Sequence, residues 1–170
     1  SVAGTTALYM ETEANGSGLI VGNNTTTSAT LEVAGTLSVT GAATVTGALT
    51  GASSIQSTSK TAGVGYAVGS GSTVTQATSR TTDVTINAVT GSITLFKTAG
   101  SATWQSFTVT NSAVTAKDLI IVNQQTGTDL YEVFITAVAA GSFRVSFATT
   151  GGTTVEAPVF NFAVIKGQTN

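Results

Sequence analysis

The stretch ITAVAAGSFRVSFATTGG, residues 135–152, decides the fold, because two alternating segments flank an Ala-Gly turn signal at 140–141. In the second segment Phe143, Val145 and Phe147 lie two residues apart, which is the spacing of one face of a β-strand. A glycine-containing dipeptide between two such segments is typical of a β-hairpin. The stretch therefore predicts paired strands with a row of large apolar side chains on one face.

Alternating patterns of this kind fill residues 73–167. We expect eight strands there, at 73–77, 83–88, 92–96, 104–110, 118–123, 130–139, 142–148 and 154–166. Turn signals separate them at 90–91, 99–100, 123–127, 140–141 and 151–152. Pro158, inside the last strand, is typical of an edge, a bulge or a crossing between sheets. All seven Phe lie in this segment, so the core is expected there.

The composition favours strands along the whole chain. Only 8% of the residues are charged, and the polarity comes from Thr, Ser, Gly and Asn, which disfavour long helices. We expect an all-β protein whose residues 73–170 form an antiparallel β-sandwich knob with jelly-roll-like connectivity, because eight strands without a Cys-Trp-Cys pattern fit that arrangement better than an immunoglobulin-type one.

A different pattern occupies residues 31–51, LEVAGTLSVTGAATVTGALTG, which repeats every six residues with Val at the third position and Gly at the fifth. One repeat buries about 3 to 5 kcal/mol worth of apolar side chain, whereas ordering its backbone costs roughly 1 to 2 kcal/mol per residue. Identical chains wound around one axis would bury these side chains together. We expect an intertwined homotrimeric β-stalk; a single-chain β-solenoid is the alternative. The expected stalk interface is Leu31, Val33, Leu37, Val39, Val45 and Leu49.

Two further segments lack a core of their own. Residues 1–30 mix Thr, Gly and Asn with short apolar clusters, and are interpreted as an attachment arm that orders on binding, or else as a disordered tail. The apolar residues expected to contact a capsid are Leu8, Tyr9, Met10, Leu19, Ile20 and Val21. Residues 52–72, rich in Ser and Gly, are interpreted as a flexible neck.

The residue inventory excludes several kinds of chemistry. The chain has no His and no Cys, which rules out His-dependent triads, thiol nucleophiles and zinc sites with nitrogen or sulfur ligands. Its six basic residues are scattered and its net charge is −2, so nucleic-acid and membrane-surface binding are not expected. No apolar run reaches the length of a membrane span, and a signal peptide is absent or already removed. We expect no cofactor and no metal.

Carboxylates are the remaining catalytic groups. The pairs Glu11 with Glu13 and Asp129 with Glu132 are close in sequence, but a hydrolase needs two carboxylates facing one cleft, and solvated charges explain these pairs better. We therefore expect no enzymatic activity; a carboxylate-based depolymerase is the minor alternative. Calcium binding by Asp129 and neighbouring loop carbonyls is a second minor hypothesis.

Aromatic side chains raise the question of ligand binding. Trp104 begins an expected strand and Tyr131 borders a loop, so either ring could stack on a sugar if it is exposed. The competing interpretation is that both belong to the core.

Several runs resemble a known kind of protein. They are GSTVTQATSRTTDVTIN (71–87), FTVTNSAV (107–114), ITAVAAGSFRVSFATTGG (135–152) and NFAVIKG (161–167). Together they look like the C-terminal β-domain of tail-fibre and other virion-surface proteins of tailed bacteriophages, which commonly follows shaft repeats similar to LSVTGAATVTGALT (37–50). The resemblance covers residues 31–167 and implies a homotrimeric structural protein on the virion surface, without catalytic chemistry.

Two functions fit this resemblance. The expected one is a head decoration, cement or head-fibre protein on the capsid exterior, whose arm binds the major capsid protein and whose knob points outward. The alternative is a tail-fibre or receptor-binding protein that contacts tail proteins and recognises a host surface polysaccharide or protein. The short stalk favours the first, since 21 residues extend at most about 70 Å.

Overall fold

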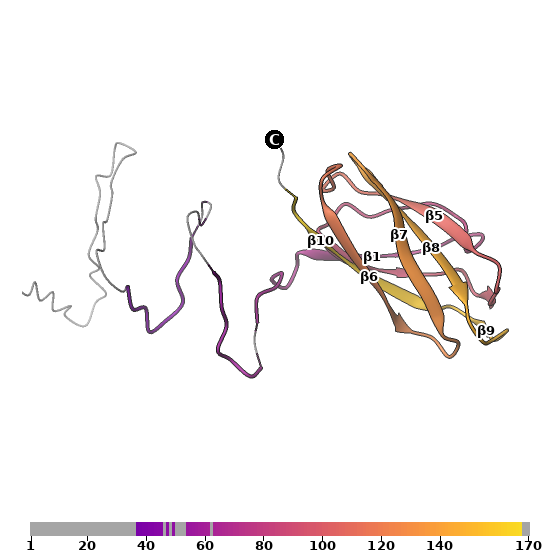
Figure 1. Cartoon of the computed structure of the whole chain (residues 1–170), viewed down its shortest axis with the longest axis horizontal. Helices are drawn as coiled ribbons and strands as arrows, with labels where there is room; N and C mark the ends of the chain where they lie inside the picture. The colour runs from indigo at the N-terminus through magenta and orange to yellow at the C-terminus, as the bar shows by residue number, and fades with distance from the viewer. Residues whose placement is uncertain (1–36, 46, 48, 50–53, 62, 168–170) are drawn as a thin grey trace, which may run out of the picture. The chain divides into compact units, whose positions relative to one another are not determined.

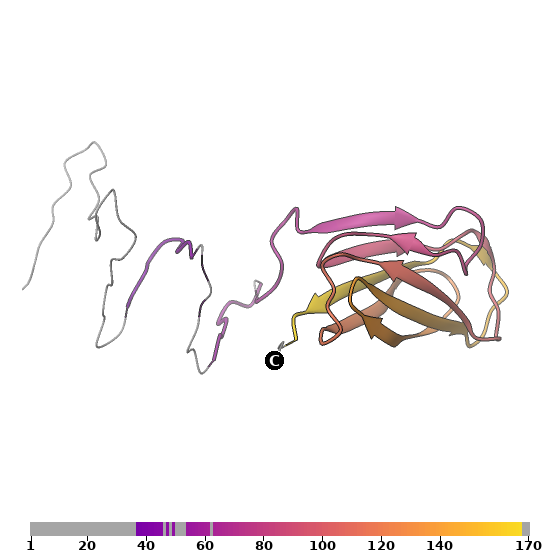
Figure 2. The same cartoon turned by 90° about the horizontal axis from the view of Figure 1, so that it is seen from above.

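The computed structural model describes residues 37–45, 47, 49, 54–61 and 63–167. The chain divides into two units, residues 1–53 and 54–170. All regular structure in the described residues is β-strand and lies after residue 70 (Figures 1 and 2). The predicted all-β fold class is confirmed for this part of the chain.

Ten strands make up three sheets. The strands are β1 (Gly71–Thr75), β2 (Val84–Thr85), β3 (Thr90–Thr94), β4 (Thr98–Ala99), β5 (Gln105–Thr110), β6 (Leu119–Thr126), β7 (Tyr131–Ala139), β8 (Ser142–Thr149), β9 (Val155–Glu156) and β10 (Val159–Ile165). Two sheets have four strands each, in the orders β1-β3-β10-β6 and β2-β5-β8-β7, and β4 pairs with β9 in a small third sheet. The hairpin of β7 and β8 is the one that residues 135–152 predict.

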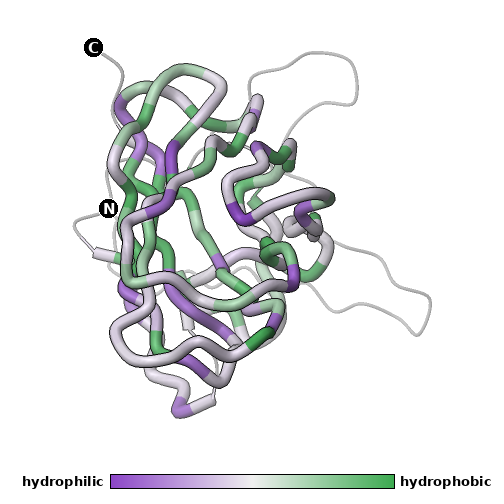
Figure 3. The backbone as a smooth tube through the Cα atoms, turned by 90° about the vertical axis from the view of Figure 1, so that its right-hand side faces the viewer, coloured by the Kyte–Doolittle hydropathy of each residue, from purple (hydrophilic) through white to green (hydrophobic). Residues whose placement is uncertain are grey.

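One core joins the two four-stranded sheets, because their facing side chains interleave. The rings of Phe143 and Phe162 lie 5.1 Å apart between centroids, and those of Phe147 and Phe160 lie 5.5 Å apart. Each pair takes one ring from β8 and one from β10, which belong to different sheets. Hydrophobic and hydrophilic residues intermingle along the backbone (Figure 3). In β8 and β10 buried positions alternate with more exposed ones, so each sheet turns one face inward.

Pairing differs from the expected pattern in two places. We expected antiparallel sheets, but β1 pairs with β3 and β2 with β5 in parallel. In each parallel pair, the chain passes through the other sheet between the two partners. β2 lies between β1 and β3 in sequence but belongs to the other sheet, and β3 lies between β2 and β5 in the same way. Periodicity reveals a strand and its faces, but not the direction of its neighbour.

Three predicted turns overlap strands, and one strand was missed. Residues 123–126 of the expected 123–127 turn lie in β6, and Ala99 of the expected 99–100 turn lies in β4. The Thr90-Gly91 dipeptide lies in β3, not in a turn. Glycine fits position 91 because neighbouring atoms approach its backbone closely: a Cβ there would lie 2.5 Å from the carbonyl oxygen of Ser72 and 2.6 Å from Ile86. The short strand β4 went unpredicted, since two residues show no periodicity. Pro158 separates β9 from β10, and so lies where the chain crosses from the small sheet into a large one.

The β-domain has two distinct ends. Gly71 of β1 pairs with Thr90, and Thr90 pairs with Ala163 of β10, so the chain enters and leaves at one end, here called the neck end (Figure 1). The opposite end, called the far end, contains the start of β5 and the β6–β7 turn. Tyr66 donates a hydrogen bond to the carbonyl oxygen of Val164, which ties the neck to β10.

An ion pair closes the neck end. The Asp118 side chain, fully buried, pairs with Lys166 and accepts hydrogen bonds from the backbone N–H of Thr115 at 2.8 Å and of Gly167 at 2.9 Å. Burial raises the pKa of Asp118, but the bonds from Lys166, Thr115 and Gly167 outweigh it and hold the pKa well below its usual range. This carboxylate joins the β5–β6 connection to the end of β10.

Candidate functional site

The predicted stalk residues that the structure describes are exposed. Leu37 is 66% exposed, Val39 51%, Val45 61% and Leu49 65%, and the described residues of this segment form no strand. Leu31 and Val33 lie outside the described residues. So do the six predicted capsid contacts, Leu8, Tyr9, Met10, Leu19, Ile20 and Val21. In one chain, therefore, the four described stalk side chains, Leu37, Val39, Val45 and Leu49, remain at least half exposed.

The two predicted ligand-contact aromatics are in opposite situations. Tyr131 is buried at 6% exposure, and its ring packs against Phe147 and Phe160. Its hydroxyl accepts a hydrogen bond from Arg80 at 2.6 Å, and burial raises its pKa. Tyr131 has no open ring face for a sugar, because it completes the core between the two sheets. Trp104, in contrast, is 52% exposed.

Trp104 belongs to an aromatic pair on the outer face of the β2-β5-β8-β7 sheet. Its ring lies 5.7 Å from that of Phe134 on β7, tilted by 39°, and Phe134 is also 52% exposed. Phe134 was expected in the core with the other Phe. The alternation of side chains along β7 could have placed Phe134 on the outer face, because its neighbours Val133 and Ile135 pack inward.

A hydrogen-bonded polar row lies beside this pair. Phe134 is in register with Ser146 of β8, whose hydroxyl lies 2.7 Å from the hydroxyl of Thr136. The Nε of Arg144 donates to the same Thr136 oxygen at 3.3 Å. Thr136 stands at a bulge of β7, which turns its side chain toward these two partners. Aromatic rings, hydroxyls and one guanidinium thus form a continuous surface.

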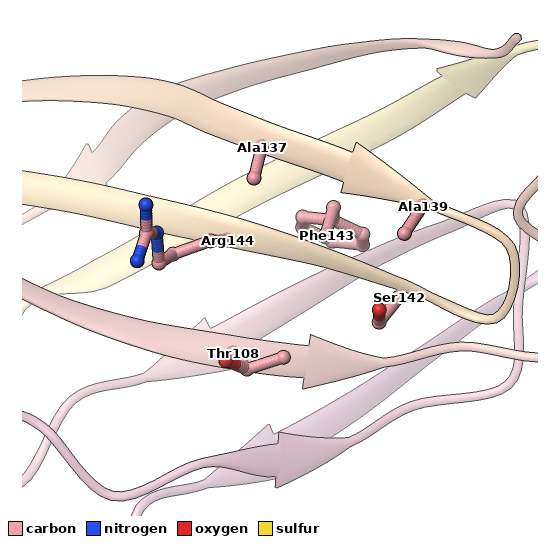
Figure 4. A pocket seen from close by; sticks show the side chains of 6 residues that line it. All are labelled: Thr108, Ala137, Ala139, Ser142, Phe143 and Arg144. Atoms are coloured by element: carbon pink, nitrogen blue, oxygen red, sulfur yellow. The ribbon is translucent and has the colours of Figure 1, made fainter. Parts of the chain in front are cut away.

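A shallow hollow of about 270 Å³ continues this surface toward the neck end. Figure 4 shows the side chains around it, which come from three neighbouring strands: Thr108, Ala137, Ala139, Ser142, Phe143 and Arg144. The alanines are small and the hydroxyls lie at the edges, so the hollow offers room together with polar groups. We call the outward side chains of β5, β8 and β7, together with Trp104, the aromatic face.

A second exposed apolar patch lies at the neck end of the other sheet. Leu119 is 60% exposed, Ile121 50% and Ile165 49%, and Leu119 pairs with Ile165 across β6 and β10. Because β6 is the edge strand of its sheet, this neck-end patch includes unpaired backbone groups beside the apolar side chains.

Two carboxylates of the β-domain, Asp129 and Glu156, accept hydrogen bonds from neighbouring segments. Asp129 accepts two hydrogen bonds from Thr154, at 2.7 Å from its hydroxyl and 2.9 Å from its backbone N–H. Glu156 accepts from the backbone N–H of Asp129 at 3.0 Å. Glu132 is exposed, on the outer face, while Asp129 is buried. Glu11 and Glu13 lie outside the described residues. Within the described ranges, no group of three or more acidic side chains is arranged to hold a metal ion.

No family model matches the sequence, and neither the curated proteins nor the solved structures include a significant match. In the part of the chain that the structure describes, no helix has the length and apolar character needed to cross a membrane.

Proposed function

We propose that this chain is a structural, non-enzymatic protein of a tailed-bacteriophage virion that assembles as a homotrimer through its hexad segment. In the favoured form it is a head decoration or head-fibre protein: residues 1–30 bind the major capsid protein, the hexads form a short stalk and the β-domain is displayed outward. The observation that carries the proposal is the exposure of the four hexad side chains that the structure describes, Leu37, Val39, Val45 and Leu49, each at least half accessible in a single chain.

Exposed aliphatic side chains that recur at a fixed interval favour association with identical copies. An isolated chain loses backbone entropy without burying them, whereas parallel copies in register bury every repeat at once. The neck-end patch of Leu119, Ile121 and Ile165 supports the same assembly, because it lies where the chain enters the β-domain and offers further apolar area to a neighbouring copy.

The connectivity of the β-domain supports a display role. The start of β1 and the end of β10 both lie at the neck end, so neither the segment before the β-domain nor the one after it joins at the far-end loops. Leu130 at 68% exposure and Val155 at 63% lie in that region. A domain tethered at one end and open at the other suits attachment to a particle surface.

The test of the assembly is the substitution Val39→Asp, examined by sedimentation velocity of the full chain. It would place a carboxylate from every copy at the common axis, so we expect trimers to dissociate into monomers. The matched control Thr40→Asp adds the same charge at the neighbouring polar position and should leave trimers intact. A Val39→Asp chain that still sediments as a trimer would refute the stalk.

The location on the particle has its own experiment. Electron cryo-microscopy of intact virions should reveal the β-domain at repeated positions on the capsid, and deleting residues 1–24 should abolish this occupancy while trimers persist. Density confined to the tail would instead support the alternative, a tail-fibre or receptor-binding protein.

A further inference from the structure

We propose that the aromatic face binds an acidic polysaccharide, with one sugar ring packed on Trp104 and Phe134 and a carboxylate of the same sugar chain paired with Arg144. The proposal depends only on side chains of the β-domain, so it holds whether or not the hexads form trimers. It goes beyond a structural role by assigning a ligand class to a specific surface.

The aromatic pair is the first element. Two large rings, each half exposed, lie 5.7 Å apart on the outside of a sheet whose inner side carries four buried aromatic side chains, Phe107, Tyr131, Phe143 and Phe147. Neither ring belongs to the buried core cluster. The CH groups of a pyranose are flat and apolar, and an exposed aromatic ring is the side chain that packs best against them.

The guanidinium is the second element and sets the sign of the ligand group that it contacts. Along the outward positions of β5, β8 and β7, Arg144 is the cation and Glu132 the anion; Arg144 lies on the neck-end side of Phe134, and Glu132 lies on the far-end side. Within the described residues only its Nε donates a hydrogen bond, and that bond goes to the neutral hydroxyl of Thr136. Its terminal N–H groups therefore remain available, and a carboxylate is the partner that a guanidinium binds with two parallel bonds.

The spacing suits a chain molecule rather than a single small ligand. Phe134 is in register with Ser146, and Arg144 lies two residues further along β8, which is about 7 Å. The hollow beyond Arg144 continues the surface in the same direction. A polymer of sugars can therefore contact the aromatic pair with one unit and Arg144 with the next.

The surroundings supply the hydrogen bonds that sugar hydroxyls need. Thr108 on β5 and Ser142 on β8 edge the hollow, and Ser146 and Thr136 lie between the rings and the guanidinium. A nucleic acid is a poor match, because its phosphates require several cations and this face has one. Hydroxyl groups around Arg144, with Glu132 on the other side of Phe134, suit a polymer that is rich in hydroxyls and whose negative charges are widely spaced.

The experiment is affinity gel electrophoresis of the full chain in gels containing polygalacturonate or alginate, with dextran as the neutral polymer. We expect both acidic polymers to retard the protein and dextran to have little effect. Trp104→Ala should weaken binding at least tenfold. Arg144→Gln should weaken it about tenfold and reduce its sensitivity to salt, since the charged contact is lost.

Matched controls keep the result specific. Lys97→Gln removes the same charge from an exposed position on the β3–β4 connection, and Leu130→Ala removes an exposed apolar side chain from the β6–β7 turn. Both should bind as the unaltered chain does. Should Trp104→Ala fail to fold, Phe134→Ala makes the same test.

Three results would overturn the proposal. The first is that neither acidic polymer retards the protein. The second is that Trp104→Ala and Arg144→Gln bind as tightly as the controls. The third is equal retardation by dextran, unaffected by Arg144→Gln, which would show that the face selects sugars without regard to charge.

Discussion

Two regions of this chain share the same spacing of apolar residues and differ in what becomes of them. In the hexad segment Val39 is 51% exposed, whereas Val145 in β8 is fully buried. Both alternate with polar neighbours, as one face of a strand requires. Val145 has β10 and its Phe side chains opposite, while the hexad segment around Val39 contains no aromatic residue and its described part forms no strand. An alternating pattern therefore specifies a face, and burial depends on a partner.

The largest effect should come from removing a ring at the centre of the buried region. Phe147→Ala deletes contacts with Phe107, Tyr131 and Phe160 at a site that is 1% exposed. We expect the free energy of unfolding to fall by about 3 to 5 kcal/mol, measured by urea denaturation with circular dichroism. Phe134→Ala, at an exposed ring, should cost about 1 kcal/mol. Equal losses would show that the outer ring is part of the core.

Next in size is the loss of a buried cation. Arg80 is 2% exposed and donates to Tyr131 and to the carbonyl oxygens of Phe96, Thr98 and Glu156. Arg80→Met fills the space but leaves these acceptors without a donor, so we expect a loss of about 3 kcal/mol in the same assay.

The exposed Arg144 is the control for this change, because Arg144→Met should alter the free energy of unfolding by about 0.5 kcal/mol or less. A neutral effect of Arg80→Met would mean that solvent or a rearranged loop satisfies the carbonyls.

A smaller effect, dependent on pH, should follow from the depressed pKa of Asp118. Its unfolded-state carboxyl binds a proton as the pH falls below its usual value of about 4, while the folded carboxyl is still ionised. Stability is therefore full above that pH and declines below it. Asp118→Asn should reduce stability at pH 7 and flatten the decline at acid pH. A gap between the two proteins that stays constant down to pH 2 would contradict this account.

The smallest effect should be in the hexads. Leu37→Ala removes a side chain that is 66% exposed, so at low protein concentration the unfolding free energy of the β-domain should change by about 0.5 kcal/mol or less. The same substitution should weaken assembly in sedimentation experiments. A large loss of β-domain stability would mean that the hexads pack on that domain.

Much of the fold was accessible from the pattern of side chains. The hairpin at residues 135–152 and the location of the core follow from alternation and turn residues, whereas Pro158 indicated only an edge, a bulge or a crossing and the structure selects the crossing. Of the candidate site, Trp104 and Tyr131 were each left open between an exposed ligand contact and a core residue; the structure exposes Trp104 and buries Tyr131, and the exposed Phe134 was not predicted. The residues around an aromatic side chain at the start of a strand do not by themselves indicate whether that side chain faces solvent or the core.

The sequence by itself determined that the chain builds strands, that residues after 70 contain the core and that His- and Cys-dependent chemistry is absent, because these depend on composition and local spacing. The tertiary structure alone decided the rest. It set β1 and β3 in parallel, brought Trp104 and Phe134 together from different strands and placed Arg144 beside them. Such contacts join residues distant in sequence, and only the packing of one sheet on the other fixes which faces remain outside.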